Sequence, residues 1–241
     1  MSTDSSLLKT LVKCGIGSRR VVADAIRQGR VTVNDRVVED FRHPLNLETD
    51  RISIDGREVR IRPGQLVYLM LNKPKGVITT TRDERGRRTV VDILPGKYRN
   101  LGLHPVGRLD KDTTGLLLLT NDGELTYKLT HPSFECEKEY LVQIEARLRP
   151  GERRKLEQGI KTENGVSHPA IVREVESCPP FNYSLTIHEG RKRQIRRMLG
   201  SLGQQCLALK RIRIGGLSIG NLQEGNSRHL QASEVRLLFQ S

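Results

Sequence analysis

The stretch HPVGRLDKDTTGLLLLT, residues 104–120, decides how the larger part of this chain folds. Its second half holds four consecutive leucines, a short apolar run that predicts a buried strand, and the turn-forming sequence NDG follows it. Its first half places Arg108, Asp110 and Asp112 directly before that strand. Because core contacts hold the strand, we expect the charged loop to be rigid, as a catalytic carboxylate requires.

Other apolar or alternating stretches surround this strand. We expect further strands over 67–71, 139–144 and 182–188, and a helix within 189–199. On that helix, Ile195, Met198, Leu199 and Leu202 would form one apolar stripe. These patterns predict a larger sheet domain over residues 66–241.

The N-terminal part has a different pattern, and Pro63 and Gly64 separate it from the sheet domain. Apolar residues at helical spacing predict a first helix that stops near Gly15. A second helix would be capped by Ser18 and would bury a stripe of apolar residues, namely Val21, Val22, Ala25 and Ile26. A hairpin over 31–38 and a strand over 51–55 follow. Residues 1–62 therefore read as a small α+β domain.

The composition indicates the kind of partner. The chain of 241 residues has 41 Lys+Arg against 28 Asp+Glu, a formal net charge of +13, and this excess favours a polyanion such as nucleic acid. Only 4% of residues are aromatic and none is Trp, which argues against binding mainly by base stacking. No apolar run approaches the ~18 residues of a membrane span, and the first residues lack a signal-peptide layout. We therefore expect a soluble, cytoplasmic protein that contacts phosphates and does not contact membranes.

The positive charge is unevenly distributed. Residues 191–213 hold eight basic side chains and no acid, so a solvated basic face or a polyanion-binding surface would both fit. On the predicted helix Arg196 lies at the edge of the apolar stripe, where a partly buried guanidinium needs an anionic partner. Arg193 and Arg197 would point toward solvent or phosphate. Arg19 and Arg20 start the second helix, an unfavourable place for cations that phosphate contact would explain, although two solvated arginines would also fit.

The sequence gives little support to metal or nucleotide chemistry. The cysteines, Cys14, Cys136, Cys178 and Cys206, are scattered and show no metal-ligand spacing, so we interpret them as reduced packing residues. A phosphate-binding loop and a nucleophile elbow are both missing from the sequence. If the protein is an enzyme, its chemistry needs neither a metal nor a nucleotide cofactor. An isolated aspartate is not evidence of catalysis, and Asp112 and Asp122 are typical of turn or cap residues.

Several motifs together resemble those of a known family. GRLD at 107–110, followed by TTG and the leucine run, is similar to the signature of the pseudouridine synthases, and more narrowly of the bacterial ribosomal-RNA branch that includes RsuA and RluB. The resemblance extends to NKPKG at 72–76, EKEY at 137–140 and EGRKRQIRRM at 189–198. The N-terminal region, with GSRR at 17–20, resembles a small RNA-binding domain shared with a ribosomal small-subunit protein.

The resemblance implies an α+β fold, with a small N-terminal helix-helix-strand RNA-binding domain and a larger catalytic domain built on a mixed, mainly antiparallel sheet. It also implies that a specific uridine in ribosomal RNA (16S or 23S) is isomerised to pseudouridine by a monomeric enzyme without cofactor or metal. Asp110 would be the essential carboxylate, Tyr140 would lie against the uracil, and Arg196 would form an ion pair with Asp110. The RNA contacts would come from basic residues of both domains: Arg19, Arg20, Lys73, Arg108, Arg191, Arg193 and Arg197.

Two other functions remain open at this point. A non-catalytic RNA-binding protein of ribosome assembly would show the same charge pattern, but it would have no reason to keep Asp110, Tyr140 and Arg196 together in a basic groove. A DNA-binding regulator would need dimerisation helices or a reading helix, and we recognise neither in the sequence. Many relatives have His at the position of Arg193, so we expect altered RNA-backbone contacts there.

Overall fold

The computed structural model describes residues 6–14, 16–17, 19–46, 48–59, 65–99, 101–163 and 165–240. By internal contacts these residues form two units. The first contains the described residues up to Val67, together with 101–102 and 121–123, and the second contains the rest. The predicted boundary at 62–66 falls largely outside the described residues and stays a prediction.

The N-terminal unit is an α+β fold, as predicted. Its elements are α1 (Leu7–Lys13), α2 (Arg19–Arg27), β1 (Val31–Val33), β2 (Arg36–Val37), β3 (Ile52–Ile54) and β4 (Arg57–Val59). The strands form an antiparallel sheet in the order β2-β1-β3-β4. Asn34 and Asp35 both have positive φ (49° and 63°), the conformation that a two-residue hairpin turn requires.

The core of this unit contains apolar residues from both helices and from β1 and β3. Of the stripe predicted for α2, Val22, Ala25 and Ile26 are buried, but Val21 is 61% exposed. The prediction is wrong for Val21 because a nine-residue helix buries a narrow stripe, and the adjacent Val22 already occupies the buried face. Ser18, the predicted cap, lies outside the described residues.

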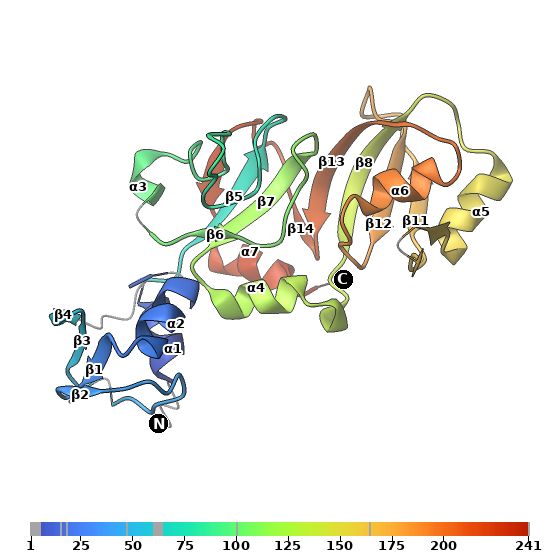
Figure 1. Ribbon diagram of the computed structural model, residues 1–241. Helices are drawn as coiled ribbons and strands as arrows, with labels where there is room; N and C mark the ends of the chain where they lie inside the picture. Colours follow the sequence, from blue (N-terminus) through green and yellow to red (C-terminus); the bar gives the residue numbers. More distant parts are fainter. Residues whose placement is uncertain are drawn as a thin grey trace. The chain divides into compact units, whose positions relative to one another are not determined.

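The second unit is built on one large sheet, which Figure 1 shows from the front. Its main path is β11-β12-β8-β13-β7-β5-β15, while β6 pairs with β7 and β14 with β13. Only the β13–β7 pair is parallel among these pairings of the described residues, so the sheet is mixed and mainly antiparallel. The strands are β5 (Tyr68–Lys73), β6 (His104–Pro105), β7 (Thr114–Thr120), β8 (Lys138–Ile144), β11 (Ile171–Glu174), β12 (Tyr183–Ile187), β13 (Cys206–Ile214), β14 (Leu217–Ser218) and β15 (Ser227–His229).

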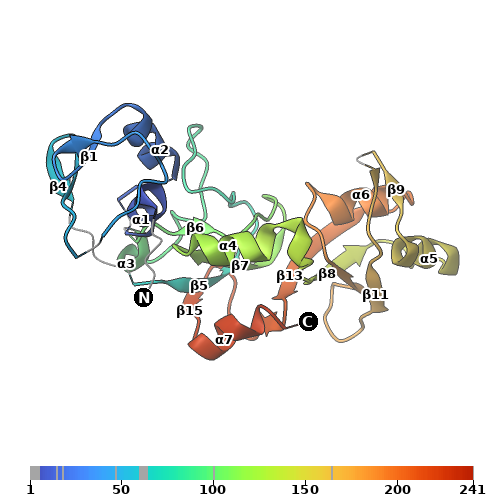
Figure 2. The same cartoon turned by 90° about the horizontal axis from the view of Figure 1, so that it is seen from below.

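The remaining elements of this unit are mostly helices: α3 (Gly96–Arg99), α4 (Gly123–Thr130), the 3-10 helix η1 (Pro132–Phe134), α5 (Pro150–Gln158), α6 (Gln194–Gly200) and α7 (Ala232–Leu237). A short hairpin joins β9 (Lys161–Thr162) to β10 (Gly165–Val166). Leu125 and Leu129 of α4 are buried in one apolar cluster with Leu116 and Leu118 of β7. Figure 2 accordingly shows α4 running beside β6 and β7.

The quoted stretch supplies an interior strand of the sheet, because β7 has β5 on one side and β13 on the other. Leu116, Leu117, Leu118 and Leu119 are all at most 2% exposed, which explains why they do not alternate with polar residues. Gly115 lies directly beside Arg211 of β13 and has a φ of +101°. A Cβ atom at Gly115 would come within 2.7 Å of the Arg211 backbone nitrogen, so only glycine permits this pairing.

Two further expectations can be compared with the structure. Cys14, Cys136 and Cys206 are half-buried and form no disulfide, but Cys178 is exposed, so the packing role predicted for all the cysteines is wrong for Cys178. Within the described ranges, no helix has both the length and the apolar character that crossing a membrane would take.

Candidate active site

The loop that precedes β7, residues 109–113, is tied to the segment that follows β5. We call it the Asp110 loop. The Thr79 hydroxyl donates to the Leu109 carbonyl at 2.8 Å, and the Gly76 amide donates to the Lys111 carbonyl at 2.9 Å. Within the loop, the Thr113 amide donates to the Asp110 carbonyl at 3.1 Å. These bonds hold the backbone on both sides of the Asp110 carboxylate, whose side chain is 32% exposed.

Two cations from other elements bind consecutive carbonyl groups of this loop. Lys73 Nζ donates to the Thr113 carbonyl at 2.9 Å and to the Lys111 carbonyl at 3.4 Å, besides the Pro74 carbonyl at 2.9 Å. Arg196 Nη2 donates to the Asp112 carbonyl at 3.3 Å. Hydrogen bonds from charged donors are stronger than neutral ones, so β5 and α6 together hold the loop in place.

The predicted RNA contact of Lys73 is wrong. Its side chain is fully buried, with 0% exposure, and its ammonium group is occupied by backbone carbonyls. Burial lowers the pKa of Lys73 to about 8, although the nearby carboxylates of Asp112, Glu224 and Asp110 oppose that shift. A group that solvent does not reach cannot bind a phosphate, so Lys73 supports the Asp110 loop from within.

Tyr140 lies on β8 and is 7% exposed. Its hydroxyl group lies 3.4 Å from Nη1 of Arg211, the residue opposite it on β13, and the Arg211 guanidinium carbon is 5.9 Å from its ring centroid. Arg211 is itself 3% exposed and donates from Nε to the Leu116 carbonyl at 2.7 Å. The buried guanidinium therefore connects Tyr140 to β7, the strand that follows the Asp110 loop.

The cation closest to the Asp110 carboxylate differs from the expected one. Nη1 of Arg193 lies 4.0 Å from Oδ2 of Asp110, whereas no ion pair within 4.0 Å joins Arg196 to Asp110. Arg196 uses its guanidinium for two backbone carbonyls, those of Asp112 and, at 2.8 Å, Cys206. The predicted pair is absent because these carbonyls hold the Arg196 guanidinium, while Arg193, the N-cap residue of α6, lies nearer to Asp110.

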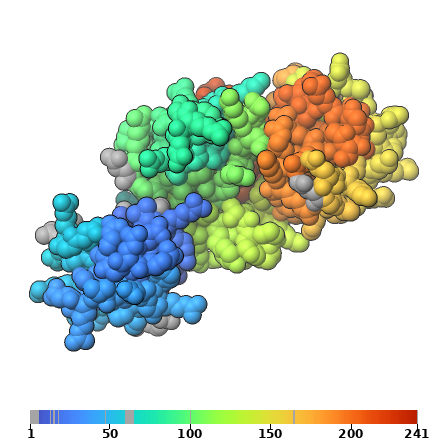
Figure 3. All heavy atoms as spheres, in the orientation of Figure 1, coloured from blue at the N-terminus to red at the C-terminus, as the bar shows by residue number. Residues whose placement is uncertain are grey.

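These groups surround a cavity of about 490 Å³. Asp110, Tyr140 and Arg211 line it together with the basic residues Arg108, Arg191 and Arg193. Its walls come from the Asp110 loop, from the α4–β8 segment and from residues 187–195. In Figure 3 the green segment around 105–115 and the orange segment around 190–200 lie on the same face of the molecule. The predicted site residues Asp110, Tyr140, Arg108, Arg191 and Arg193 are thus brought together, while Lys73, Arg196 and Arg197 do not line the cavity.

Some of the charge in residues 191–213 is balanced by acids elsewhere in the chain. Arg191 pairs with Glu189 at 2.7 Å, and Arg197 pairs with Glu163 at 2.8 Å. Arg213 pairs with both Glu137 and Glu139. The expectation that Arg197 points to solvent or phosphate is wrong, because its side chain is only 24% exposed and faces Glu163. Glu189 is only two residues from Arg191, but Glu163 of the β9–β10 hairpin and Glu137 and Glu139 at the start of β8 are distant in sequence from their partners.

Comparison with known proteins identifies the family. The family model for RNA pseudouridylate synthase matches residues 67–201, which include the Asp110 loop, β8 and α6. The chain belongs to the RNA pseudouridylate synthase family. A second family model, that of the S4 domain, matches residues 6–52.

Individual relatives agree with this assignment over nearly the whole length. The Bacillus subtilis protein named ribosomal large subunit pseudouridine synthase B is 38% identical over 96% of this chain and 94% of its own. An uncharacterized RNA pseudouridine synthase of Mycobacterium leprae is 40% identical over 97% of this chain and 91% of its own. A solved pseudouridylate synthase is 32% identical with a TM-score of 0.68, covering 97% of this chain and 99% of that one.

This RNA pseudouridine synthase thus combines an S4 domain with a catalytic domain, and its family membership favours the enzyme over a non-catalytic RNA-binding protein or a DNA-binding regulator. In the S4 domain, Arg19 and Arg20 are exposed in the first turn of α2, and that turn contains no acidic residue. Their contact with RNA stays a prediction, and the exposure of both side chains would permit it.

The sequence interpretation missed Arg211 as a residue of the synthase's cavity. It counted only as one of several charges in the basic stretch. One signal was present: Arg211 lies in the strand segment LKRIRI at 209–214, where Leu209, Ile212 and Ile214 are apolar. That pattern does not tell which face of β13 is covered, and only the pairing with β7 and β8 shows that the Arg211 side chain is enclosed.

Proposed function

We propose that this pseudouridine synthase isomerises a specific uridine of ribosomal RNA to pseudouridine, with Asp110 as the essential carboxylate. The observation that carries the proposal is the cavity in which Asp110 and Tyr140 lie together under a basic rim. The name of the B. subtilis relative supports ribosomal RNA, and makes large-subunit RNA the first substrate to test. The proposal further places the enzyme in the cytoplasm, where bacterial ribosomal RNA is made, and has it act as a monomer.

In the proposed reaction the bond between N1 of uracil and C1′ of ribose breaks, the base rotates, and C5 becomes bonded to C1′. The proton on C5 leaves and N1 gains one, so that substrate and product are isomers. Positive character develops at C1′ as the first bond breaks, and the Asp110 carboxylate attacks or stabilises that carbon. The bonds from Thr79, Lys73 and Arg196 to the Asp110 loop hold the carboxylate in position beforehand.

The two arginines near Asp110 have different roles in this proposal. Arg193, with Nη1 4.0 Å from Oδ2 of Asp110, places a positive charge beside the carboxylate. Arg196, bonded to the Asp112 carbonyl, is a positioning residue that acts through the backbone of the Asp110 loop. Arg108 is exposed at the rim of the cavity, where it can occupy the gap left when the target nucleotide turns out of its stack.

Tyr140 supplies an aromatic surface for the uracil ring and a hydroxyl group for the proton movements. Arg211 fixes that hydroxyl group, because its guanidinium cannot lose its charge and donates toward the phenol oxygen. Arg211 therefore acts as a positioning residue for Tyr140. Arg211 also donates to the Leu116 carbonyl. Contacts across β8, β13 and β7 therefore set the position of Tyr140 relative to Asp110.

Mapping pseudouridine in cells tests the proposal directly. Substrate and product have equal mass, so ribosomal RNA from cells with and without the gene is treated with carbodiimide and read by reverse transcription. We expect one stop to disappear on deletion and to return when the wild-type gene is supplied. The Asp110→Asn variant should not restore it, although its affinity for RNA should stay within about twofold of the wild type.

Asp122→Asn is the matched control. Asp122 follows β7 in sequence and is not among the residues that line the cavity, and Asn serves as well as Asp in turns and caps. This variant should restore the stop fully. If deletion removes no stop from either ribosomal RNA, the ribosomal substrate is wrong, and if Asp110→Asn restores the stop, the role of Asp110 is wrong.

A further inference from the structure

Three aromatic side chains meet at the end of α4 and in η1. We call Tyr127, His131 and Phe134 the aromatic cluster. The ring centroids of Tyr127 and His131 are 4.8 Å apart, those of Tyr127 and Phe134 are 5.7 Å apart, and those of His131 and Phe134 are 6.3 Å apart. The Tyr127–Phe134 pair is edge-to-face at 82°, an arrangement that leaves ring faces uncovered.

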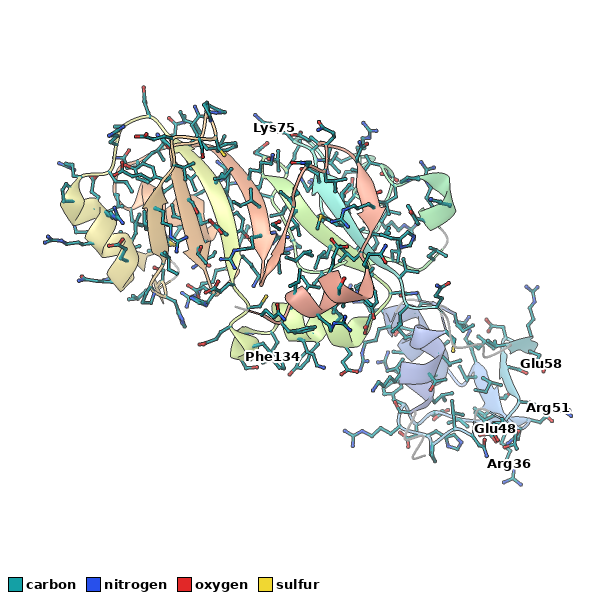
Figure 4. All side chains as sticks on the ribbon, turned by 180° about the vertical axis from the view of Figure 1, so that it is seen from behind. Arg36, Glu48, Arg51, Glu58, Lys75 and Phe134 are labelled. Atoms are coloured by element: carbon teal, nitrogen blue, oxygen red, sulfur yellow. The ribbon has the colours of Figure 1, made fainter. Side chains whose placement is uncertain are left out.

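This cluster is unusual in its exposure. The chain has five Tyr, four Phe and no Trp, and most of these rings are buried or half-buried. The exposed ones are Tyr127 at 54%, Phe134 at 49% and Phe239 at 54%. Figure 4 shows Phe134 at the outer edge of the catalytic unit, beside α4. Two of the three exposed rings therefore pack against each other, where burial in the protein core does not explain them.

The aromatic cluster is continuous with the cavity that holds Asp110. His131, together with Leu129, Thr130 and Pro132 from the same segment, lines that cavity. The His131 ring position is fixed by Ser133, whose hydroxyl group lies 2.7 Å from Nδ1. Tyr127 and Phe134 both contact His131, so a chain that occupies the cavity along this wall would lead toward the two rings.

The charges on the other walls of the cavity indicate what the rings bind. Arg108, Arg191, Lys192 and Arg193 line the same cavity and are all exposed. This combination of a basic groove and adjacent exposed aromatic rings is the one that single-stranded nucleic acid requires, because phosphates follow the cations and bases stack on the rings. A protein partner would gain little from so many cations around one small apolar patch.

We propose that the aromatic cluster is a second base-binding site, where an unpaired nucleobase next to the target uridine stacks on Tyr127 and Phe134. This inference rests on the proposed function, since it takes RNA as the occupant of the cavity. It adds a site for a neighbouring base, so the enzyme recognises an unpaired nucleotide beside the uridine that it modifies.

The absence of Trp from the sequence provides a clean spectroscopic test. Phe134→Trp, made together with Asp110→Asn to prevent turnover, introduces a single tryptophan at the cluster. Unmodified 16S and 23S transcripts are then titrated, with binding measured independently from the anisotropy of end-labelled RNA. We expect the transcript that binds to quench tryptophan emission by more than half, because stacking on a base places the indole in direct contact with it. The matched control Phe239→Trp, in the same background, should keep its emission.

A second measurement separates base stacking from phosphate binding. The double variant Tyr127→Leu/Phe134→Leu keeps apolar side chains but removes both ring faces. We expect its KM for RNA to rise by roughly tenfold to a hundredfold, its kcat at saturating RNA to change by less than about twofold, and its salt dependence of binding to stay unchanged. Phe239→Leu should behave as the wild type does.

Each outcome decides between this proposal and the proposed function. Binding without quenching, or a wild-type KM for the double variant, overturns the base-binding site and leaves the proposed function intact. A double variant that is defective on ribosomal particles but normal on free RNA shows that the cluster contacts a protein, which also overturns the site. If neither transcript binds, the ribosomal substrate itself is wrong.

Discussion

Two groups of basic side chains surround the Asp110 loop, and they differ in whether protein or solvent surrounds them. The inner cations, Lys73 and Arg211, are at most 3% exposed and donate to backbone carbonyls of the protein, as half-buried Arg196 also does. The outer cations, Arg108, Arg191 and Arg193, are exposed and line the cavity. The same contrast holds between two nearby lysines, since Lys73 at the end of β5 is enclosed, whereas Lys75, labelled in Figure 4, is exposed.

This difference shows that a basic residue near an RNA site need not touch RNA. Inner cations have exchanged water for carbonyl groups, so their loss should change the stability of the fold and the rate of the chemical step. Outer cations remain accessible to water, so their loss should change RNA affinity and its dependence on salt. The first three predictions below each remove a member of one group, and the last removes exposed arginines of the S4 domain.

The largest expected effect concerns Lys73 and pH. Its pKa is about 8 in the folded protein against an ordinary value of 10.5, so between these values the unfolded chain binds more protons than the folded one. The free energy of unfolding should therefore rise with pH across this window by about 3 kcal/mol more in the wild type than in Lys73→Met. Urea unfolding at several pH values from 7 to 10.5 measures the difference.

Lys75→Met is the control for this experiment, because an exposed ammonium keeps its water in both states. Its unfolding profile should run parallel to that of the wild type. Parallel profiles for Lys73→Met as well would show that the buried ammonium does not titrate with folding.

The next effect concerns Arg211, the inner cation that contacts Tyr140. Arg211→Met should lower kcat by about tenfold to a hundredfold, because the Tyr140 hydroxyl loses the group that fixes it. Arg211→Lys should recover part of the loss, as an ammonium can replace one of the two hydrogen bonds. Single-turnover rates at saturating RNA measure the step. A raised KM with unchanged kcat would instead make Arg211 an RNA-binding residue.

A smaller effect is expected at the outer cation nearest the carboxylate. Arg193→Ala should lower kcat/KM about threefold to fivefold, since the pair with Asp110 is 4.0 Å long and both side chains are partly exposed. The loss should shrink at high salt, where such pairs are screened. Arg154→Ala removes an exposed arginine of α5, outside the cavity, and should have no effect. A salt-independent loss would contradict the assignment of Arg193 to the outer group.

The smallest effect should come from the S4 domain. Replacing Arg19 and Arg20 with Ala should weaken RNA binding and flatten the plot of log affinity against log salt. The slope should fall by roughly 0.9 for each duplex phosphate that the domain no longer neutralises, and by somewhat less on single strands. Arg36→Ala, also in the S4 domain, is the matched control because it removes an exposed arginine of β2, outside α2. An unchanged slope for the double variant would remove α2 from the RNA-binding surface.

Much of the fold could be predicted because its signals are local. The helical spacing of Leu7, Leu8 and Leu11 and the leucine run of β7 each lie within one element, and the structure confirms both. Val21 shows the limit of such patterns: it adjoins a buried residue on α2, yet it faces solvent. Whether a residue at the margin of a stripe is covered depends on what packs there.

The candidate site could be predicted only in part, because local motifs reveal some of its residues and not their partners. Asp110 and Tyr140 belong to strong motifs and do line one cavity. The expected Arg196–Asp110 pair is replaced by bonds from Arg196 to the carbonyls of Asp112 and Cys206. A helical wheel places Arg196 at the edge of α6 but contains no information on the carbonyl groups that other segments bring to that edge.

The sequence by itself determined the net charge of +13, the order of the main elements and the motifs that resemble the family. The tertiary structure decided which of those charges remain for RNA. Lys73 meets a carbonyl 40 residues away, Arg196 one 84 residues away and Arg211 one 95 residues away. The physical reason is that desolvation and hydrogen bonding depend on neighbours in space, so residues of one type and one charge become either structural supports or RNA-binding groups.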